Sequence, residues 1–231
     1  MGTSILLHGS NQIIDMPRLQ SGNPRNDYGR GFYCTTVEEL AGEWACKKQT
    51  DGFINRYELE MTDLNVLDLS DDNHTVLNWI AILLKNRTFN LHSQLSIEAR
   101  EYLIEHFAID TTAYDLVVGY RADDSYFQYA EAFVENSLPL RNLNRALTLG
   151  NLGIQTVLVS EKAFSQLKFL GAEHVDSRIY YPKFLERDTN ARETYSKRIA
   201  GSKSYRNDIF VMDILREEMS NNDPRLQRIL S

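Results

Sequence analysis

The sequence predicts an α+β fold with a mixed or split β-sheet core and surrounding helices. Residues 53–61 alternate apolar and polar side chains, as expected for a strand with one solvent-facing side. Residues 154–159 form a β-branched apolar run that is typical of a central strand. Apolar residues recur at helical spacing over residues 72–87 and 96–107. Because strands and helices do not alternate regularly, the pattern favours α+β over a doubly wound α/β fold.

The remaining elements follow from shorter signals of the same kind. Ser160 is a helix N-cap candidate, and Gly171 marks the end of the helix that would follow it. Further strands are expected at residues 4–7, 66–69, 114–119 and 172–181, and further helices at residues 37–49, 125–136, 139–149, 161–170 and 209–219. We expect a catalytic domain at residues 1–181, with a helical insertion at about 72–107. Residues 182–231 would form a helical C-terminal extension.

The composition is ordinary for a soluble globular protein, with 42% hydrophobic and 25% charged residues in a chain of 231. A net charge of -7 argues against a general nucleic-acid coat but leaves room for a local basic face. Two cysteines, Cys34 and Cys46, make no disulfide framework and are typical of a reducing compartment. The N-terminal residues lack the features of a signal peptide, and no apolar stretch is long enough to span a bilayer. We therefore expect a cytoplasmic protein with no membrane partner.

The most informative stretch is residues 26–36, which predict a loop that enters a short strand and then a helix. Gly29 and Gly31 permit backbone conformations closed to other residues and let a ligand approach the main chain closely. Thr36 and Glu39 have the spacing of a capping box, so the helix is expected to begin there.

Two aromatic residues lie eleven positions apart across this strand and helix, Tyr33 and Trp44. They could close on a planar ligand from both sides, and each aromatic pair contributes about 0.5–1.5 kcal/mol beyond burial. Packing of both rings in the core is the alternative, because aromatic residues on helices usually pack there.

Polar residues that could contact a ligand occur at the ends of two predicted strands and within a third. His8, Gly9 and Ser10 follow the first strand and offer polar groups suited to an amide or ribose, although such a triplet is also common in turns. Gln155 is a polar residue within an otherwise apolar strand. Asp123 and Asp124 follow another strand and could contact a ligand or cap the next helix.

Residues 178–206 are basic, with eight Lys or Arg against three acidic residues. They form either a solvated helix with charge pairs or a docking surface for an anionic partner such as nucleic acid.

Taken in order, His8-Gly9-Ser10, Gly29-Arg30-Gly31-Phe32-Tyr33, Trp44 and Gln155 resemble the ADP-ribosyltransferase catalytic domain of the diphtheria-toxin and poly-ADP-ribose-polymerase type. In that superfamily a His-Gly-Thr/Ser leaves the first strand and a Gly-Lys-Gly-Ile-Tyr-Phe-Ala follows. A second aromatic residue lies eleven positions beyond the tyrosine. The resemblance covers about residues 8–160 and is closest to a bacterial branch, some of whose members are encoded in toxin–antitoxin or phage-defence loci.

The resemblance implies NAD+ as substrate and no metal. It implies that His8 binds the adenosine ribose, that Gly9 holds the nicotinamide carboxamide through its backbone, and that Tyr33 and Trp44 sandwich the nicotinamide ring. The implied NAD+-binding set is His8, Gly9, Ser10, Arg30, Gly31, Tyr33 and Trp44. The implied catalytic set is His8, Tyr33 and Gln155.

Gln155 departs from the glutamate of the better-known members. Glutamine can still hydrogen-bond a ribose hydroxyl, but it carries no charge, which costs about 1 kcal/mol in such a bond. It also supplies no general base, an effect that is typically about 10²–10⁴-fold in rate. We therefore expect single transfers rather than chain elongation, with the base supplied by Asp123, Asp124 or the acceptor.

The resulting hypothesis is a mono-ADP-ribosyltransferase, a glycosyltransferase that moves ADP-ribose from NAD+ to a protein or nucleic acid and releases nicotinamide. It would act as a bacterial toxin of a toxin–antitoxin or antiviral defence system, with an antitoxin as a further partner. Two alternatives stay open: a catalytically inactive module that binds NAD or a partner on the same fold, and an NAD glycohydrolase.

Overall fold

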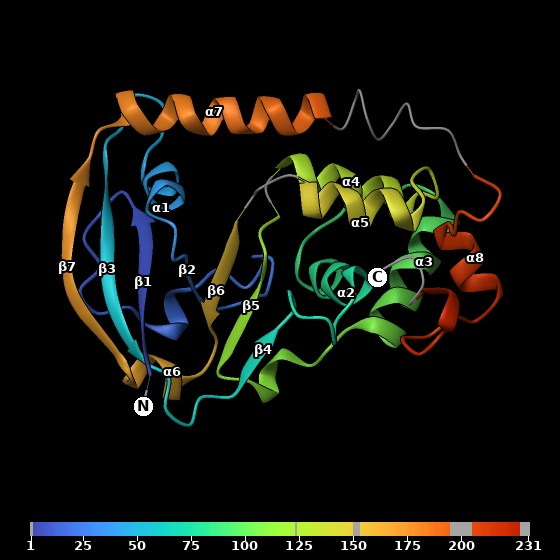
Figure 1. Cartoon of the computed structure of the whole chain (residues 1–231), viewed down its shortest axis with the longest axis horizontal. Coiled ribbons are helices and arrows are strands. Elements are labelled where there is room, and N and C mark those ends of the chain that lie inside the picture. The colour runs from blue at the N-terminus through green and yellow to red at the C-terminus, as the bar shows by residue number, and fades with distance from the viewer. Residues whose placement is uncertain (1, 123, 150–152, 195–204, 227–231) are drawn as a thin grey trace. The chain divides into compact units, whose positions relative to one another are not determined.

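The computed structural model describes residues 2–122, 124–149, 153–194 and 205–226. The chain divides into two compact units, and the segments of these units alternate along the sequence. The first unit contains both β-sheets, and the described elements of the second are helices. The fold is therefore mixed α+β, as predicted (Figure 1). The first unit comprises residues 1–68, 110–121 and 153–189, and the second comprises residues 69–109, 122–152 and 190–231. The domain boundary expected at residue 181 stays a prediction.

The elements that the structure describes are, in chain order, β1 (Thr3–Ser10), η1 (Leu19–Ser21), β2 (Phe32–Cys34), α1 (Glu38–Ala45), β3 (Gly52–Glu60), β4 (Val66–Asp68), α2 (Val76–Asn86), α3 (Gln94–Phe107), η2 (Thr111–Ala113), β5 (Leu116–Tyr120), α4 (Asp124–Val134), α5 (Leu140–Leu149), β6 (Ile154–Leu158), α6 (Glu161–Ser165), β7 (Leu167–Val175), α7 (Ser177–Thr194) and α8 (Val211–Arg216).

Two sheets form the first unit. One sheet has the strand order β1-β3-β7 and is antiparallel, and the other has the order β2-β6-β5-β4 and is parallel between β4 and β5 (Figure 1). The sheets are joined where Leu7 of β1 and Thr35, just after β2, exchange two backbone hydrogen bonds of 2.8 and 2.9 Å. The core is thus a split sheet whose halves meet near the end of the first strand.

Each face of β1 is buried by a different partner, because successive side chains of a strand point to opposite sides. Leu6 belongs to a core cluster that contains Phe32 and Leu158 from the second sheet. Leu7 belongs to a separate cluster with Ala41 of helix α1. Burying each leucine stabilises the unit by about 1.5–3 kcal/mol, so β1 is fixed from both sides.

The second unit contains α2, α3, α4, α5 and α8. Residues 76–84 of α2 are all buried, so this helix is covered on every side and lies within the unit. None of the helices in the described ranges is long and apolar enough to cross a membrane.

The predicted capping box at Thr36 and Glu39 is wrong. Val37 is the N-cap of α1 and has no side-chain cap, while the Thr35 hydroxyl accepts a hydrogen bond of 3.1 Å from the Val37 N–H. Thr35 must stay extended to pair with β1, so the helix begins later than predicted. It ends at Ala45 rather than at residue 49. The chain has to turn there, because β3 starts against the end of the helix.

The predicted helix at residues 161–170 and strand at residues 172–181 are wrong at their shared boundary. Ser160 does cap α6 through a 3.1 Å hydrogen bond from the Ala163 N–H, but that helix ends at Ser165. After Gln166, the nine residues Leu167–Val175 form β7 along β3, and α7 begins at Ser177. Pairing with β3 overrides local helix propensity here, because Leu167 and Phe169 alternate toward the core.

Candidate functional site

The candidate site lies where the two sheets separate. After the backbone hydrogen bonds between Leu7 and Thr35, the next link between the two sheets comes from a side chain. His8 Nδ1 donates a 2.6 Å hydrogen bond to the carbonyl oxygen of Tyr33. A carbonyl oxygen can only accept, so Nδ1 carries the proton and Nε2 of the neutral ring is an acceptor. The bond therefore fixes both the orientation and the tautomer of His8.

His8 is held in its neutral form. Burial lowers the pKa of the His8 imidazole below its ordinary value, and the hydrogen bond to the Tyr33 carbonyl offsets this only in part. The imidazole also lies 4.4 Å from the Phe32 ring between centroids. A neutral ring with a fixed acceptor nitrogen suits recognition of a hydroxyl group.

Gly9 of β1 packs directly against helix α1. A Cβ atom at this position would be 1.9 Å from the Ala41 carbonyl oxygen and 2.8 Å from the Trp44 Cβ. The absence of a side chain at Gly9 thus lets α1 approach β1 and brings Trp44 beside the strand. Within the described part of the chain, the indole Nε1 of Trp44 is buried without a hydrogen-bond partner. The Arg121 guanidinium lies 5.3 Å from the centre of the indole ring.

The phenol of Tyr33 is anchored in the loop that precedes β2. Its hydroxyl donates to the Gly29 carbonyl oxygen at 2.7 Å and accepts from the Tyr28 N–H at 3.0 Å. Gly29 has a φ of 76°, which favours glycine, so this loop does use the conformational freedom expected of it. The two-sided clamp of Tyr33 and Trp44 stays a prediction.

Gln155 is buried in β6, opposite Gly119 of β5, with 3% of its surface exposed. Its Nε2 donates to Oδ2 of Asp27 at 3.1 Å and to the Tyr120 carbonyl oxygen at 3.3 Å. The Tyr28 hydroxyl donates to the same carbonyl at 2.7 Å. The loop at residues 26–29 therefore connects the Tyr33 phenol with the Gln155 amide by hydrogen bonds.

The other residues predicted to bind NAD+ make packing or loop contacts. The Ser10 hydroxyl accepts a 3.3 Å hydrogen bond from the Gln12 N–H, and exposed Arg30 donates to the Gln20 carbonyl oxygen at 2.6 Å. Gly31 is buried against β6, where a Cβ atom would be 2.5 Å from Cγ1 of Val157. The need for glycine at this position is thus steric.

Asp123 lies outside the described residues, and so does the side chain of Asp124. Their proposed role as a base or acceptor contact stays a prediction.

Two residues of the predicted basic surface form ion pairs within the first unit. Lys183 and Arg187 of α7 form ion pairs with Glu39 and Glu43 of α1, and the Arg187–Glu43 distance is 2.6 Å. The Tyr180 ring packs where Gly42 leaves room. These contacts hold α7 against the helix that carries Trp44. Residues 195–204 of the basic stretch lie outside the described ranges.

A buried asparagine supports the His8 segment, and sequence reasoning missed it. Asn55 of β3 is fully buried, and its Oδ1 accepts a 2.8 Å hydrogen bond from the Ile14 N–H. Its Nδ2 donates to the carbonyl oxygens of His8 and Gln12 at 3.3 and 3.2 Å. A polar residue on the same strand face as Tyr57 was the available signal. Asp27 was also missed, because an acidic residue in a loop gives no sign of burial.

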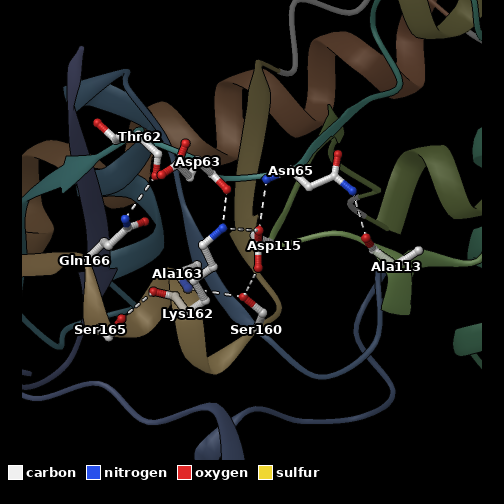
Figure 2. Close-up of polar contacts among 10 residues, drawn as sticks. All are labelled: Thr62, Asp63, Asn65, Ala113, Asp115, Ser160, Lys162, Ala163, Ser165 and Gln166. Atoms are coloured by element: carbon white, nitrogen blue, oxygen red, sulfur yellow. Dashed lines mark hydrogen bonds and ion pairs between the residues drawn. The ribbon is translucent and has the colours of Figure 1, made fainter. Parts of the chain in front are cut away.

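A second polar network fixes the opposite end of the β5–β6 pair. Figure 2 shows the carboxylate of Asp115 accepting hydrogen bonds from the Asn65 N–H at 2.9 Å and the Ser160 hydroxyl at 2.5 Å, with Lys162 3.7 Å away. The Asn65 N–H, the Ser160 hydroxyl and Lys162 lower the pKa of the Asp115 carboxyl below its ordinary value. We interpret this network as structural, because each charged or polar group in it stabilises the turn into α6 or the start of β4.

The described residues include no group of three or more His, Cys, Asp or Glu side chains that could hold a metal ion. Comparison with curated proteins gives no match. Comparison with solved structures also gives no match. One family model, described as "Protein of unknown function (DUF3990)", matches residues 4–169. Since this match covers more than half of the chain, the protein belongs to the DUF3990 family.

Proposed function

We propose that the protein is a mono-ADP-ribosyltransferase that transfers ADP-ribose from NAD+ to a protein or nucleic-acid acceptor. The observation that carries the proposal is a set of hydrogen bonds within the first unit. These bonds link His8 to the Tyr33 backbone, the Tyr33 phenol to Tyr28, and Tyr28 through the Tyr120 carbonyl to Gln155. Residues from four strands, β1, β2, β5 and β6, thus share one hydrogen-bonded framework at the divergence of the two sheets.

The chemical properties of these residues suit a dinucleotide. His8 offers a fixed acceptor nitrogen for a ribose hydroxyl, and Gln155 offers an amide oxygen for another. The Trp44 ring is already in contact with the cationic Arg121 group, and an indole face that attracts guanidinium also attracts the positively charged nicotinamide ring of NAD+. The two-sheet core with its junction at β1 supports the ADP-ribosyltransferase-like architecture that the sequence resembles.

The proposed reaction breaks the bond between the ribose C1′ and the nicotinamide nitrogen. The bonding electron pair leaves with nicotinamide, and the ribose passes through an oxocarbenium-like transition state. A nucleophile of the acceptor then bonds to C1′ and loses its proton. Residues that hold the ribose hydroxyls and the nicotinamide ring would accelerate the first step by fixing the orientation of the scissile bond.

A catalytically inactive NAD-binding module is the second candidate, and the neutral Gln155 is the observation that favours it. Without a charged group on the side chain, the site has less electrostatic stabilisation for a developing cation. An NAD glycohydrolase would use the same first step with water as acceptor. We also propose that the transferase acts as a toxin in a toxin–antitoxin or phage-defence system, on the basis of the sequence resemblance.

Incubation with NAD+ labelled in the adenylate group distinguishes these candidates. Free nicotinamide, label on protein and label on nucleic acid are measured separately. A transferase releases nicotinamide and labels one polymer, a glycohydrolase releases nicotinamide alone, and a binding module does neither.

Tyr33→Ala and Gln155→Ala are expected to reduce nicotinamide release by about tenfold or more, which corresponds to about 1.4 kcal/mol or more of transition-state stabilisation. Tyr205→Ala is the matched control, because Tyr205 is 62% exposed and belongs to the second unit. Full activity in both site variants, with unchanged melting temperatures, would refute the assignment.

A further inference from the structure

The loop between η1 and β2 places an acidic residue inside the first unit. Only 6% of the surface of Asp27 is exposed, although the residue belongs to a loop segment that is polar in sequence. Its Oδ2 accepts the 3.1 Å hydrogen bond from Gln155 Nε2. A carboxyl group is rarely buried without a specific polar role, because desolvation disfavours its charged form. Asp27 is therefore a candidate for such a role at Gln155.

The contacts of Gln155 fix which end of its amide is available. The Tyr120 carbonyl oxygen can only accept, and Oδ2 of Asp27 accepts in the ionised form of the carboxyl group, so the amide nitrogen of Gln155 faces both. If the amide rotated by 180°, its own oxygen would face these two oxygens and two hydrogen bonds would be lost. Within the described part of the chain, Oε1 receives no hydrogen bond. Gln155 therefore presents an acceptor, not a donor, to any ligand.

We infer that Asp27 is a positioning residue of this site: it orients the Gln155 amide so that Oε1 accepts a hydrogen bond from the reacting ribose, and it supplies the buried acidic group that Gln155 lacks. The inference deepens the proposed function and rests on it. A glutamate would combine acceptor and charge in one side chain. Here the two properties are divided between Gln155 and the carboxylate 3.1 Å behind its nitrogen. The amide is polarised by this neighbour, which makes Oε1 a stronger acceptor.

The contact between Asp27 and Gln155 predicts how the protein responds to Gln155→Glu, which restores the glutamate of the better-known members. Gln155→Glu would bring a second carboxyl group to within hydrogen-bonding distance of Asp27. Two such groups cannot both ionise easily, so they share a proton and one of the two pKa values rises. A carboxyl whose folded-state pKa is raised contributes stability that is complete below its unfolded-state pKa of about 4.3, and this contribution is lost as the pH rises to the folded-state pKa. The variant is therefore expected to be less active and less stable at pH 8 than at pH 5.5, relative to the parent protein.

The experiment compares Asp27→Asn, Gln155→Glu and the double variant, with Asp15→Asn as a charge-matched control from an exposed position in the same unit. Nicotinamide release from NAD+ is measured between pH 5.5 and 8. We expect Asp27→Asn to lower kcat about tenfold, with KM for NAD+ changed by about twofold or less, and Asp15→Asn to change neither. Gln155→Glu should lose activity as the pH rises. The double variant should exceed both single variants at pH 8 and lose this pH dependence, because the amide introduced at position 27 can donate a hydrogen bond to the carboxylate introduced at position 155.

Melting temperatures of the same variants provide a readout that needs no substrate. The melting temperature of Gln155→Glu should fall below that of the parent by about 3 °C more at pH 8 than at pH 5.5, and Asp27→Asn should remove this difference in the double variant. The inference is overturned if Asp27→Asn behaves like Asp15→Asn in kcat, or if the double variant is no better than Gln155→Glu. A parent protein that releases no nicotinamide refutes the proposed function and the catalytic part of this inference. The melting series then still decides whether Asp27 orients Gln155.

Discussion

Replacing Asn55 by alanine tests the claim that the His8 segment is held by a buried side chain. Asn55→Ala removes three hydrogen bonds at once, with the Ile14 N–H and with the carbonyl oxygens of His8 and Gln12. Each such bond contributes about 0.5–1.5 kcal/mol net, and an unsatisfied buried partner adds to the loss. We therefore expect Asn55→Ala to lower the free energy of unfolding of the first unit by about 2–4 kcal/mol.

The assay is urea denaturation at pH 7, followed by amide hydrogen exchange at Ile14. Asn23→Ala is the matched control, because Asn23 is exposed and accepts one 3.0 Å hydrogen bond from the Arg25 N–H. It should cost about 0.5 kcal/mol or less. The Ile14 amide hydrogen should exchange faster in Asn55→Ala than in the parent protein. In the control it should exchange at the rate of the parent protein.

The reasoning about Asn55 is refuted if both asparagine variants lose the same stability, or if Ile14 exchange is unaffected. A variant in which His8 and Gln12 keep their positions without the side chain would mean that the strand pairing alone holds this segment. The pairing of β1 with β3 would then be sufficient to build that side of the candidate site.

Three further predictions concern stability. The pKa of Asp115 is lowered by its hydrogen bonds, so its contribution is complete above about pH 4 and is lost as the pH falls through the folded-state pKa. Asp115→Asn should therefore cost about 1–2 kcal/mol at pH 7 in urea denaturation, and the gap to the parent should close in acid. The pKa of His8 is lowered by burial, so the unfolded chain takes up the proton first and stability falls below about pH 6.5. A melting series on His8→Gln should lack this fall, and an identical slope in both proteins would contradict the burial argument. Gly31→Ala would place a Cβ atom 2.8 Å from the Leu158 carbonyl oxygen and should cost about 1–3 kcal/mol, whereas Gly2→Ala, with nothing within 4 Å, should be neutral in the same assay.

Local patterns predicted the elements of this fold better than they predicted its contacts. The alternation in β3 and the β-branched run of β6 located both strands to within one residue at each end. The same approach failed at β7, where Leu167 and Phe169 are apolar at a spacing of two but follow a helix cap. The outcome there depends on pairing with β3, a contact that no local window contains.

The candidate site was predictable in its residue types and not in its framework. His8 and Tyr33 could be singled out because a polar or aromatic residue stood near the end of a predicted strand, and Gln155 because it was a polar residue within an otherwise apolar strand. The Asp27–Gln155 hydrogen bond spans 128 residues, and only the folded chain brings the two side chains together. Trp44 was expected beside Tyr33. In the structure its Cβ lies against Gly9, where any side chain at position 9 would collide with it.

The interleaving of the two units along the chain has a consequence for synthesis. A chain emerging from the ribosome exposes β1, β2 and α1 early, but β6 follows only after residue 153, and β7 completes the first sheet at Val175. Pairing between segments so distant is slow to nucleate, since loop closure has to precede it. A nascent or prematurely terminated chain that stops before β6 therefore contains the histidine and the tyrosine without the glutamine, and it cannot assemble the proposed site.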